Sequence, residues 1–256
     1  MFRLMFSRRW WWTTLLVLAG IGLTIRLGIW QIDRYNENKA FADHLTAMQA
    51  AAPLTVSGTA GPPDLTGMEY RAILATGTFD FGRQIAVRNQ IWAQSWGNAT
   101  GYILVTPLVF QDGSAILVDR GWIPEEDDTP ASWRQFDQPG LVTVSGIIRL
   151  PARPEIGGVP DPTLSPGQTS LEFWNLIDIP RLQKQIPYPI LPVYLEQAPD
   201  PNQDQMPYRL LPEPDLSASD TNEGYAAMWF CFTGLLFFGY PVYLRRQTSD
   251  IVLPEK

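Results

Sequence analysis

The sequence predicts a membrane protein in which two transmembrane α-helices flank a β-rich domain outside the cytoplasm. Apolar spans occur at residues 10–30 and 224–244, and short alternating patterns with turn residues fill the segment between them. A helix needs about 20 apolar residues to cross the hydrocarbon core of a bilayer. Because no helical pattern separates the strands, the middle segment is expected to form a mainly antiparallel sheet or a small barrel.

The first span is free of charge from Trp10 to Ile25, and Arg26 interrupts it before residues 27–30 complete it. Residues 1–9 carry three arginines and no acidic residue, which places the N-terminus in the cytoplasm. A secretory signal peptide is the alternative, although the span is longer than a signal core. The short N-terminal segment leaves no room for an organelle transit peptide, so a bacterial plasma (inner) membrane is expected.

The composition of residues 33–220 narrows the function classes. This segment has 23 acidic and 12 basic residues, a net charge of −11, which does not suit nucleic acid or anionic lipid. The single cysteine, Cys231, falls in the second span, so the sequence holds no C-x-x-C redox or haem-attachment motif. His44 is the one histidine and is expected on a helix surface, so no catalytic triad and no metal cluster are predicted.

After the first span, residues 31–52 keep helical spacing as a stalk, which Pro53 ends. Seven segments then have strand patterns, and Asp112-Gly113 supplies a hairpin turn between two of them. The expected strands are residues 70–79, 84–89, 101–110, 115–119, 141–150, 171–176 and 192–196.

Two stretches are rich in proline: one lies within the domain predicted for residues 31–196, and the other follows this domain. Residues 151–166 hold five prolines and are expected to form a loop. Residues 197–223 form a proline-rich acidic connector that returns the chain to the second span at 224–244. Two arginines open residues 245–256, so the C-terminus is also placed in the cytoplasm.

Blocks spread along the chain resemble the surfeit-locus-one family of cytochrome oxidase assembly factors. Residues 27–34 (L-G-I-W-Q-I-D-R) are similar to its L-G-x-W-Q-x-x-R signature, and residues 118–124 (V-D-R-G-W-I-P) to its V-[ND]-R-G-W-[IV]-P block. Residues 225–230 (Y-A-A-M-W-F) resemble its last block, Y-A-x-x-W-[FY]. Matches at residues 101–107 and 146–149 fit the same series in order.

This resemblance implies a non-enzymatic chaperone that helps to supply haem a to the catalytic subunit of a haem–copper oxidase, with the haem a synthesis machinery as a further partner. The family usually has a histidine, its proposed haem ligand, three residues before the last block. This sequence has Asn222 there, and a carboxamide is a poor iron ligand beside imidazole, which disfavours direct axial ligation by this helix. The cofactor that the resemblance implies is haem a, held transiently. A structural or sensory two-span protein, and a membrane-anchored hydrolase or transferase, remain alternatives.

The candidate cofactor-binding residues lie where the two spans meet the outer membrane surface. They are Trp30, Gln31, Arg34, Tyr225 and Trp229. Helical spacing puts the first three on one face of the first helix and the other two on one face of the second. An arginine beside a tryptophan suits a haem propionate. A purely interfacial role for these residues stays open.

Arg120, Gly121 and Trp122 are predicted to form a turn after a strand. The glycine is expected to let Trp122 fold back onto the sheet edge while Arg120 pairs with an acid. Docking of the oxidase subunit is the alternative role of these three residues. No catalytic residue and no metal ligand are predicted.

Overall fold

The computed structural model describes residues 7–58, 64–94, 97–151, 163–164, 168, 170–200, 205–211 and 217–249. The chain divides into two compact units. One unit holds Met1–His44 and Pro214–Lys256, and the other holds Leu45–Glu213. The first is a pair of helices, and the second is a sheet domain.

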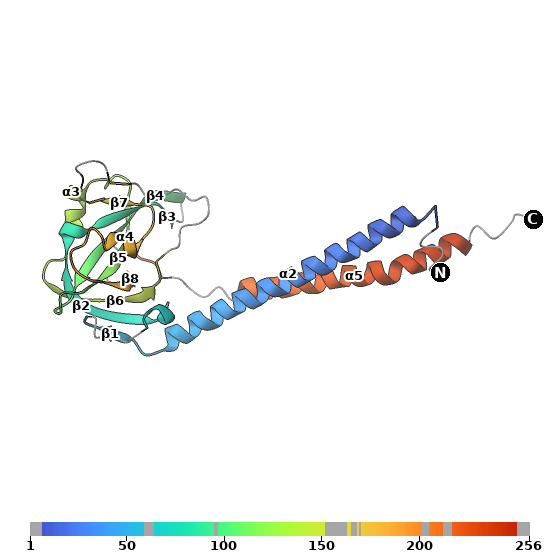
Figure 1. Cartoon of the computed structure of the whole chain (residues 1–256), viewed down its shortest axis with the longest axis horizontal. Helices are drawn as coiled ribbons and strands as arrows, with labels where there is room; N and C mark the ends of the chain where they lie inside the picture. Colours follow the sequence, from blue (N-terminus) through green and yellow to red (C-terminus); the bar gives the residue numbers. More distant parts are fainter. Residues whose placement is uncertain are drawn as a thin grey trace, which may run out of the picture. The chain divides into compact units, whose positions relative to one another are not determined.

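The helix pair consists of α2 (Trp11–Ala50) and α5 (Ser217–Ser249), which lie side by side (Figure 1). Each contains a stretch that is long and apolar enough to cross a membrane. α2 runs without a break through the predicted span and nearly all of the predicted stalk, because no proline or glycine pair stops it before Pro53. α5 covers the whole second span and continues past Pro241.

Side-chain hydrogen bonds join α2 and α5 at two levels along the helix pair. The hydroxyl oxygens of Thr14 and Tyr240 lie 2.6 Å apart, and those of Thr24 and Thr233 lie 2.8 Å apart. Residue numbers rise along α2 as they fall along α5, so the helices are antiparallel. Such hydrogen bonds suit an apolar environment, where small polar residues help helices to associate.

The sheet domain contains a strand at each predicted position and one more at its start. The strands are β1 (Leu54–Val56), β2 (Ala72–Phe79), β3 (Ile85–Gln94), β4 (Gly97–Val109), β5 (Ala115–Pro124), β6 (Leu141–Arg149), β7 (Phe173–Trp174) and β8 (Ile190–Gln197). The extra strand is β1, and β7 is shorter than predicted. Two short helices, α3 (Pro130–Trp133) and α4 (Ile179–Leu182), lie between later strands.

The sheet is mixed, so the prediction of a mainly antiparallel sheet is wrong. The strand order is β1-β2-β6-β8-β5-β4-β3-β7, and a further β2–β4 pairing closes five of these strands into a ring. The pairs β1–β2, β3–β7 and β5–β8 are parallel. The long connection between β6 and β8, which contains α4, brings β8 back beside β5 in the parallel direction. A parallel pair needs such a crossover. In the described part of this connection the one α-helix is α4, which has four residues and leaves no periodic pattern in the sequence.

β5 is buried on both faces, because apolar clusters lie on either side of it. Every residue from Ala115 to Ile123 is buried. Val118 packs in the cluster that includes Phe79 and Leu195, whereas Leu117 packs in the cluster that includes Trp174. The hairpin from β4 to β5 turns at Asp112-Gly113 as predicted, with Gly113 at a φ of 82°. The central strand of the domain therefore carries the 118–124 block.

Part of the predicted acidic connector belongs to the sheet domain. Tyr208 pairs with Trp122 of β5 through two backbone hydrogen bonds of 2.8 and 2.9 Å. Residues 205–211 therefore lie against the domain instead of leading directly to the second helix. At the two ends of the predicted connector, Gln197 is the last residue of β8 and residues 217–223 are the first residues of α5. Residues 201–204 and 212–216, and most of the predicted 151–166 loop, lie outside the described residues.

Candidate functional site

The first and last family blocks meet inside the helix pair. Gly28 is buried in α2, and a Cβ atom at this position would lie 2.8 Å from Cζ of Phe230 on α5. A side chain larger than hydrogen would push the ring away. The glycine of the L-G-x-W-Q block therefore makes room for the final aromatic residue of the Y-A-x-x-W-[FY] block.

Gln31, one turn beyond Gly28, is the buried polar residue of this interface. It is 9% exposed, and its Oε1 atom is buried without a hydrogen-bond partner. The antiparallel contacts place it at the level of the buried Ala226 on α5, whose small side chain leaves room. A buried acceptor without a partner is costly, so Gln31 is poorly explained by helix packing alone.

Trp30, Arg34, Tyr225 and Trp229 lie on the same side of the helix pair. Trp30 is one residue before Gln31 and Arg34 is three residues after it. Helical spacing turns both side chains away from the α5 interface in the same direction around α2. Tyr225 and Trp229 are likewise turned away from the α2 interface, around α5. Because the helices are antiparallel, both rotations lead to the same side of the helix pair. Trp30 is 51% and Tyr225 is 48% exposed, so aromatic surface is available there.

Within the part of the chain that the structure describes, Arg34 forms one exposed ion pair, in which its Nη1 atom lies 3.3 Å from Oε2 of Glu37. Exposed pairs of this kind contribute little to stability, so the guanidinium group can exchange partners at small cost. Asn222 falls within α5, but its side chain lies outside the described residues.

The second predicted group does not form a turn, so that prediction is wrong. β5 continues through it, and the β4–β5 register passes from Val105–Asp119 to Leu104–Gly121, which leaves Arg120 as the extra residue of a β-bulge. Gly121 has a φ of +114°, and a Cβ atom there would lie 2.5 Å from the carbonyl oxygen of Tyr208. A bulge re-aims a side chain, and here it turns Arg120 into the domain.

Arg120 is fully buried, and neutral groups bind its guanidinium. Nη1 donates to Oε1 of Gln84 at 3.0 Å, Nη2 donates to the backbone oxygen of Phe136, and the rings of Phe79 and Phe81 lie beside the charge. Burial lowers the pKa of Arg120 to about 10. Arg120 forms no salt bridge with an acid among the described residues; Asp137 favours its charge only through a longer-range electrostatic interaction.

Trp122 is 4% exposed and stacks near Trp92 and Tyr208, with ring centroids 6.1 and 6.2 Å away. Its Nε1 atom donates to the backbone oxygen of Gln90 at 3.2 Å. Because Arg120 and Trp122 are buried, the geometry favours the structural role predicted for them. Docking by these residues stays a prediction.

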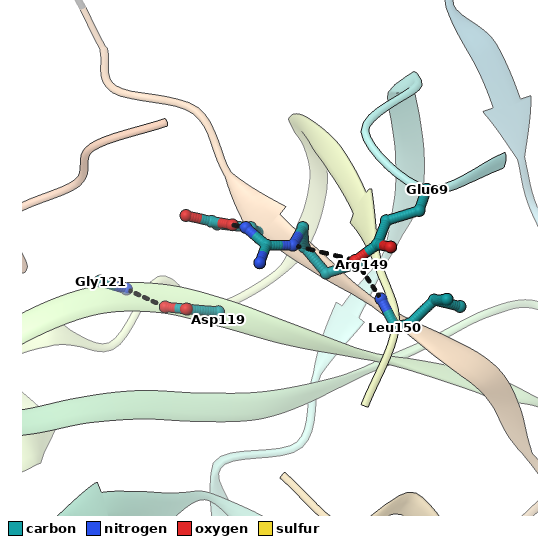
Figure 2. Close-up of polar contacts among 6 residues, drawn as sticks. Glu69, Asp119, Gly121, Arg149 and Leu150 are labelled. Atoms are coloured by element: carbon teal, nitrogen blue, oxygen red, sulfur yellow. Dashed lines mark hydrogen bonds and ion pairs between the residues drawn. The ribbon is translucent and has the colours of Figure 1, made fainter. Parts of the chain in front are cut away.

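Sequence reasoning missed a group of acidic residues beside this block. Asp119 on β5 lies opposite Glu196 on β8, and Arg149 on β6 contacts Glu196 and Glu69 (Figure 2). Burial raises the pKa of the Asp119 carboxyl to about 7, and the nearby Glu196 adds to this rise. The signal available in the sequence was an aspartate inside an otherwise apolar strand.

In the part of the chain that the structure describes, no group of three or more His, Cys, Asp and Glu side chains is placed to hold a metal ion. His44 is exposed on α2, as expected for a helix-surface residue.

Comparison with known proteins gives one consistent result. The model of the SURF1 family matches residues 18–234. "Surfeit locus protein 1" of Takifugu rubripes is 27% identical over 139 residues, which are 50% of this chain and 57% of that protein. "SURF1-like protein" of Monosiga brevicollis is 30% identical over 134 residues, 50% of this chain and 51% of that protein. "Surfeit locus protein 1" of Arabidopsis thaliana is 26% identical over 238 residues, 76% of this chain and 65% of that protein.

The chain thus spans about half to two thirds of the length of these relatives. The family match runs from within α2 to within α5 and includes all of the blocks described above. The chain belongs to the SURF1 family.

Proposed function

We propose that this chain is a membrane-bound assembly factor, not an enzyme, for the haem–copper cytochrome c oxidase, and that it assists insertion of haem a into the catalytic subunit. The observation that carries the proposal is the meeting of two family blocks at Gly28 and Phe230, which gathers the candidate residues on one side of the helix pair. Membership of the SURF1 family supports the same function.

In this proposal both helices cross a bacterial plasma membrane, and the sheet domain lies outside the cytoplasm. Large apolar side chains cover the exposed surface of α2 and α5, which suits contact with lipid. Arginines at positions 8, 9, 245 and 246 support cytoplasmic termini. Reporter fusions after Arg246 and near Gly140 test this topology, which predicts a cytoplasmic signal from the first and an external signal from the second.

The residues of the helix pair fit a haem group on three grounds. Trp30, Tyr225 and Trp229 offer aromatic surface to the macrocycle, and its burial contributes about 25 cal/mol per Å² of apolar surface. Arg34 is available to a propionate at the cost of a weak ion pair. Gln31 Oε1 has no partner, and a protonated propionate or the side-chain hydroxyl of haem a supplies the donor that it lacks.

Haem a, once delivered, supplies the redox and oxygen chemistry of the oxidase. The chain's own residues hold the group by apolar contact, charge pairing and one hydrogen bond. Iron ligation is not required, since Asn222 replaces the histidine of the family pattern and is a weak ligand. We therefore expect transient binding followed by transfer, with the haem a synthesis machinery as donor and the oxidase subunit as acceptor.

The site is tested by comparing purified variants for haem retention. Arg34→Ala is expected to weaken retention about fivefold, the value of a partly exposed charge pair. Asn222→Ala is expected to have a smaller effect, and Asn222→His to shift the absorbance spectrum toward imidazole ligation. Lys39→Ala, at another exposed cation on α2, is the control. A larger loss with Asn222→Ala than with Arg34→Ala contradicts the site.

The function is tested by purifying the tagged chain from its native membrane and identifying bound proteins by mass spectrometry. Enrichment of the oxidase catalytic subunit over a tag-only control is expected. Reproducible absence of oxidase subunits, combined with no haem absorbance, contradicts the assembly-factor proposal and favours a structural or sensory protein.

A further inference from the structure

The sheet domain contains a cavity of about 250 Å³ that the proposed function does not use. It lies where segment 205–211 crosses β5, beside the end of β8 and the middle of β3. Its wall includes Trp92, Trp122 and Tyr208, whose ring centroids lie 5.6 to 6.2 Å apart. The strongly exposed side chains of Ile91 and Leu210 also line it, so its outer part is apolar.

The inner part of the cavity presents hydrogen-bond acceptors. Asp119 and Glu196 line it from adjacent parallel strands, and Gln197 follows Glu196. The Oε1 atom of Gln197 is buried and has no hydrogen-bond partner. Asp119 is 9% exposed and accepts from the backbone N–H of Gly121 at 2.9 Å. Buried acceptors normally have donors, so this arrangement calls for a donor from outside the chain.

The two arginines beside the cavity are engaged mainly with groups other than Asp119. Arg149 is shared between Glu196, at 2.5 Å, and Glu69, at 3.5 Å (Figure 2). Arg209 also lines the cavity, but its Nε atom donates to the backbone oxygen of Arg120. The charge of Arg209 interacts with Asp200 more strongly than with Asp119. Among the described residues, Asp119 therefore makes no ion pair of its own and is left for a cation from outside the chain.

We propose that this cavity binds the cationic end of an alkylammonium or alkylguanidinium group, either on a lysine or arginine side chain or on a free amine. The head donates to Asp119 and Gln197, and the alkyl stem lies along the aromatic wall toward Ile91 and Leu210. A cation beside tryptophan and tyrosine rings gains further attraction. The net negative charge of the surrounding domain attracts cations to the cavity.

The ionisation of Asp119 supports this assignment. Its pKa is raised to about 7 by burial and by Glu196 on β8, against the smaller opposing effects of Arg149 on β6 and Arg209 on segment 205–211. A bound cation favours the ionised carboxylate, so binding releases a proton. Affinity is therefore expected to rise as the pH increases through about 7.

The test uses the full chain in detergent with ¹⁵N-labelled tryptophan, and n-butylammonium chloride as the probe. Saturable shifts are expected for the indole N–H signals of Trp92 and Trp122. Trp133 and Trp174 are internal controls, because neither side chain lines the cavity. n-Butanol and sodium butyrate match the probe in size without its charge, and both are expected to bind much more weakly.

Asp119→Asn keeps an acceptor for Gly121 but removes the charge, and it is expected to weaken binding at about pH 8 by tenfold or more and to abolish its pH dependence. Gln197→Leu is a second variant, which removes the unpartnered oxygen and is expected to weaken binding at every pH. Asp128→Asn removes an exposed carboxyl outside the cavity and is the control. Each variant's folding is checked by the dispersion of the Trp133 and Trp174 signals.

A peptide, acetyl-Gly-Lys-Gly-amide, separates the two sources of the cation. Binding of the peptide, and not of its norleucine counterpart, assigns the cavity to a partner's side chain, whereas binding of butylammonium alone assigns it to a free amine. Equal binding of butanol or butyrate overturns the proposal. So does unchanged affinity in both folded variants, Asp119→Asn and Gln197→Leu.

Discussion

Gly28 and Phe230 are in contact across the α2–α5 interface, with the phenyl ring where the side chain of any residue larger than glycine would begin. The contact joins the first and last blocks of the SURF1 pattern in this chain. It also fixes the register of the two helices, on which the relative placement of Trp30 and Tyr225 depends. The geometry of the proposed haem site therefore depends on this glycine, together with the contact between Thr24 and Thr233.

Gly28→Leu is expected to weaken helix association by about 1–3 kcal/mol, as overpacking does in a filled interface. Gly22→Leu is the matched control, because a Cβ atom at Gly22 meets nothing within 4 Å. Association is measured by disulfide formation between cysteines at Thr24 and Thr233, in a chain with Cys231→Ser. An equal loss of cross-linking in Gly28→Leu and Gly22→Leu would contradict the assigned contact. Recovery of cross-linking when Phe230→Ala is added to Gly28→Leu would confirm it.

Gln31→Leu is expected to separate stability from function. Removing a buried acceptor that lacks a partner should strengthen helix association by about 1 kcal/mol or more. The same change should lower haem retention if this oxygen accepts a hydrogen bond from the ligand. Cross-linking and haem absorbance are measured on the same samples. Weaker association, or unchanged haem retention, argues against a ligand-binding role for Gln31.

Arg120→Ala is expected to lower the free energy of unfolding of the sheet domain by at least about 2 kcal/mol. The substitution leaves a buried cavity and removes the donor that binds the oxygens of Gln84 and Phe136. Arg134→Ala, at an exposed arginine, should change the stability by less than about 0.5 kcal/mol. Thermal unfolding measures both. Wild-type stability combined with loss of oxidase binding would instead establish the docking role.

Asp119 makes the stability of the sheet domain depend on pH. Its folded-state pKa of about 7 exceeds the ordinary 3.8, so the folded state holds the proton more tightly. The stabilisation that comes from this bound proton is complete below about pH 4 and is lost as the pH rises through about 7. In the wild type, the free energy of unfolding should decline by a few kcal/mol over this pH range, and Asp119→Asn should remove this decline. Denaturant unfolding at several pH values measures it. An unchanged slope would contradict the assignment to Asp119.

The two long helices and seven of the eight strands could be predicted because each has a local signal, whereas the short elements β1, α3 and α4 were missed. The run from Trp10 to Ile25 has no charge, and Asp112-Gly113 marks the hairpin between β4 and β5. The parallel pairing of β8 with β5 has no such signal, since alternation within a strand does not specify its neighbour. The bulge at Arg120 was missed for the same reason, because it is defined by register against β4.

The candidate site was predictable in part. Helical spacing placed Trp30 with Arg34 and Tyr225 with Trp229, but the relation between the two pairs required the contacts of Gly28 and Thr24 with α5. Asp119 and Glu196 are distant in the sequence, and the mixed strand order alone brings them together. A site built across parallel strands can be found only once their register is known.

The proposed function requires that cells need this chain to build a haem-containing oxidase. The measurement is the haem a content of the oxidase catalytic subunit purified from cells that lack this chain, compared with cells that carry it from a plasmid. We expect the subunit to accumulate with much less haem a in the deletion strain, and the wild-type chain and Gly22→Leu to restore it, whereas Gly28→Leu restores it poorly. A full complement of haem a in the absence of the chain would contradict the account.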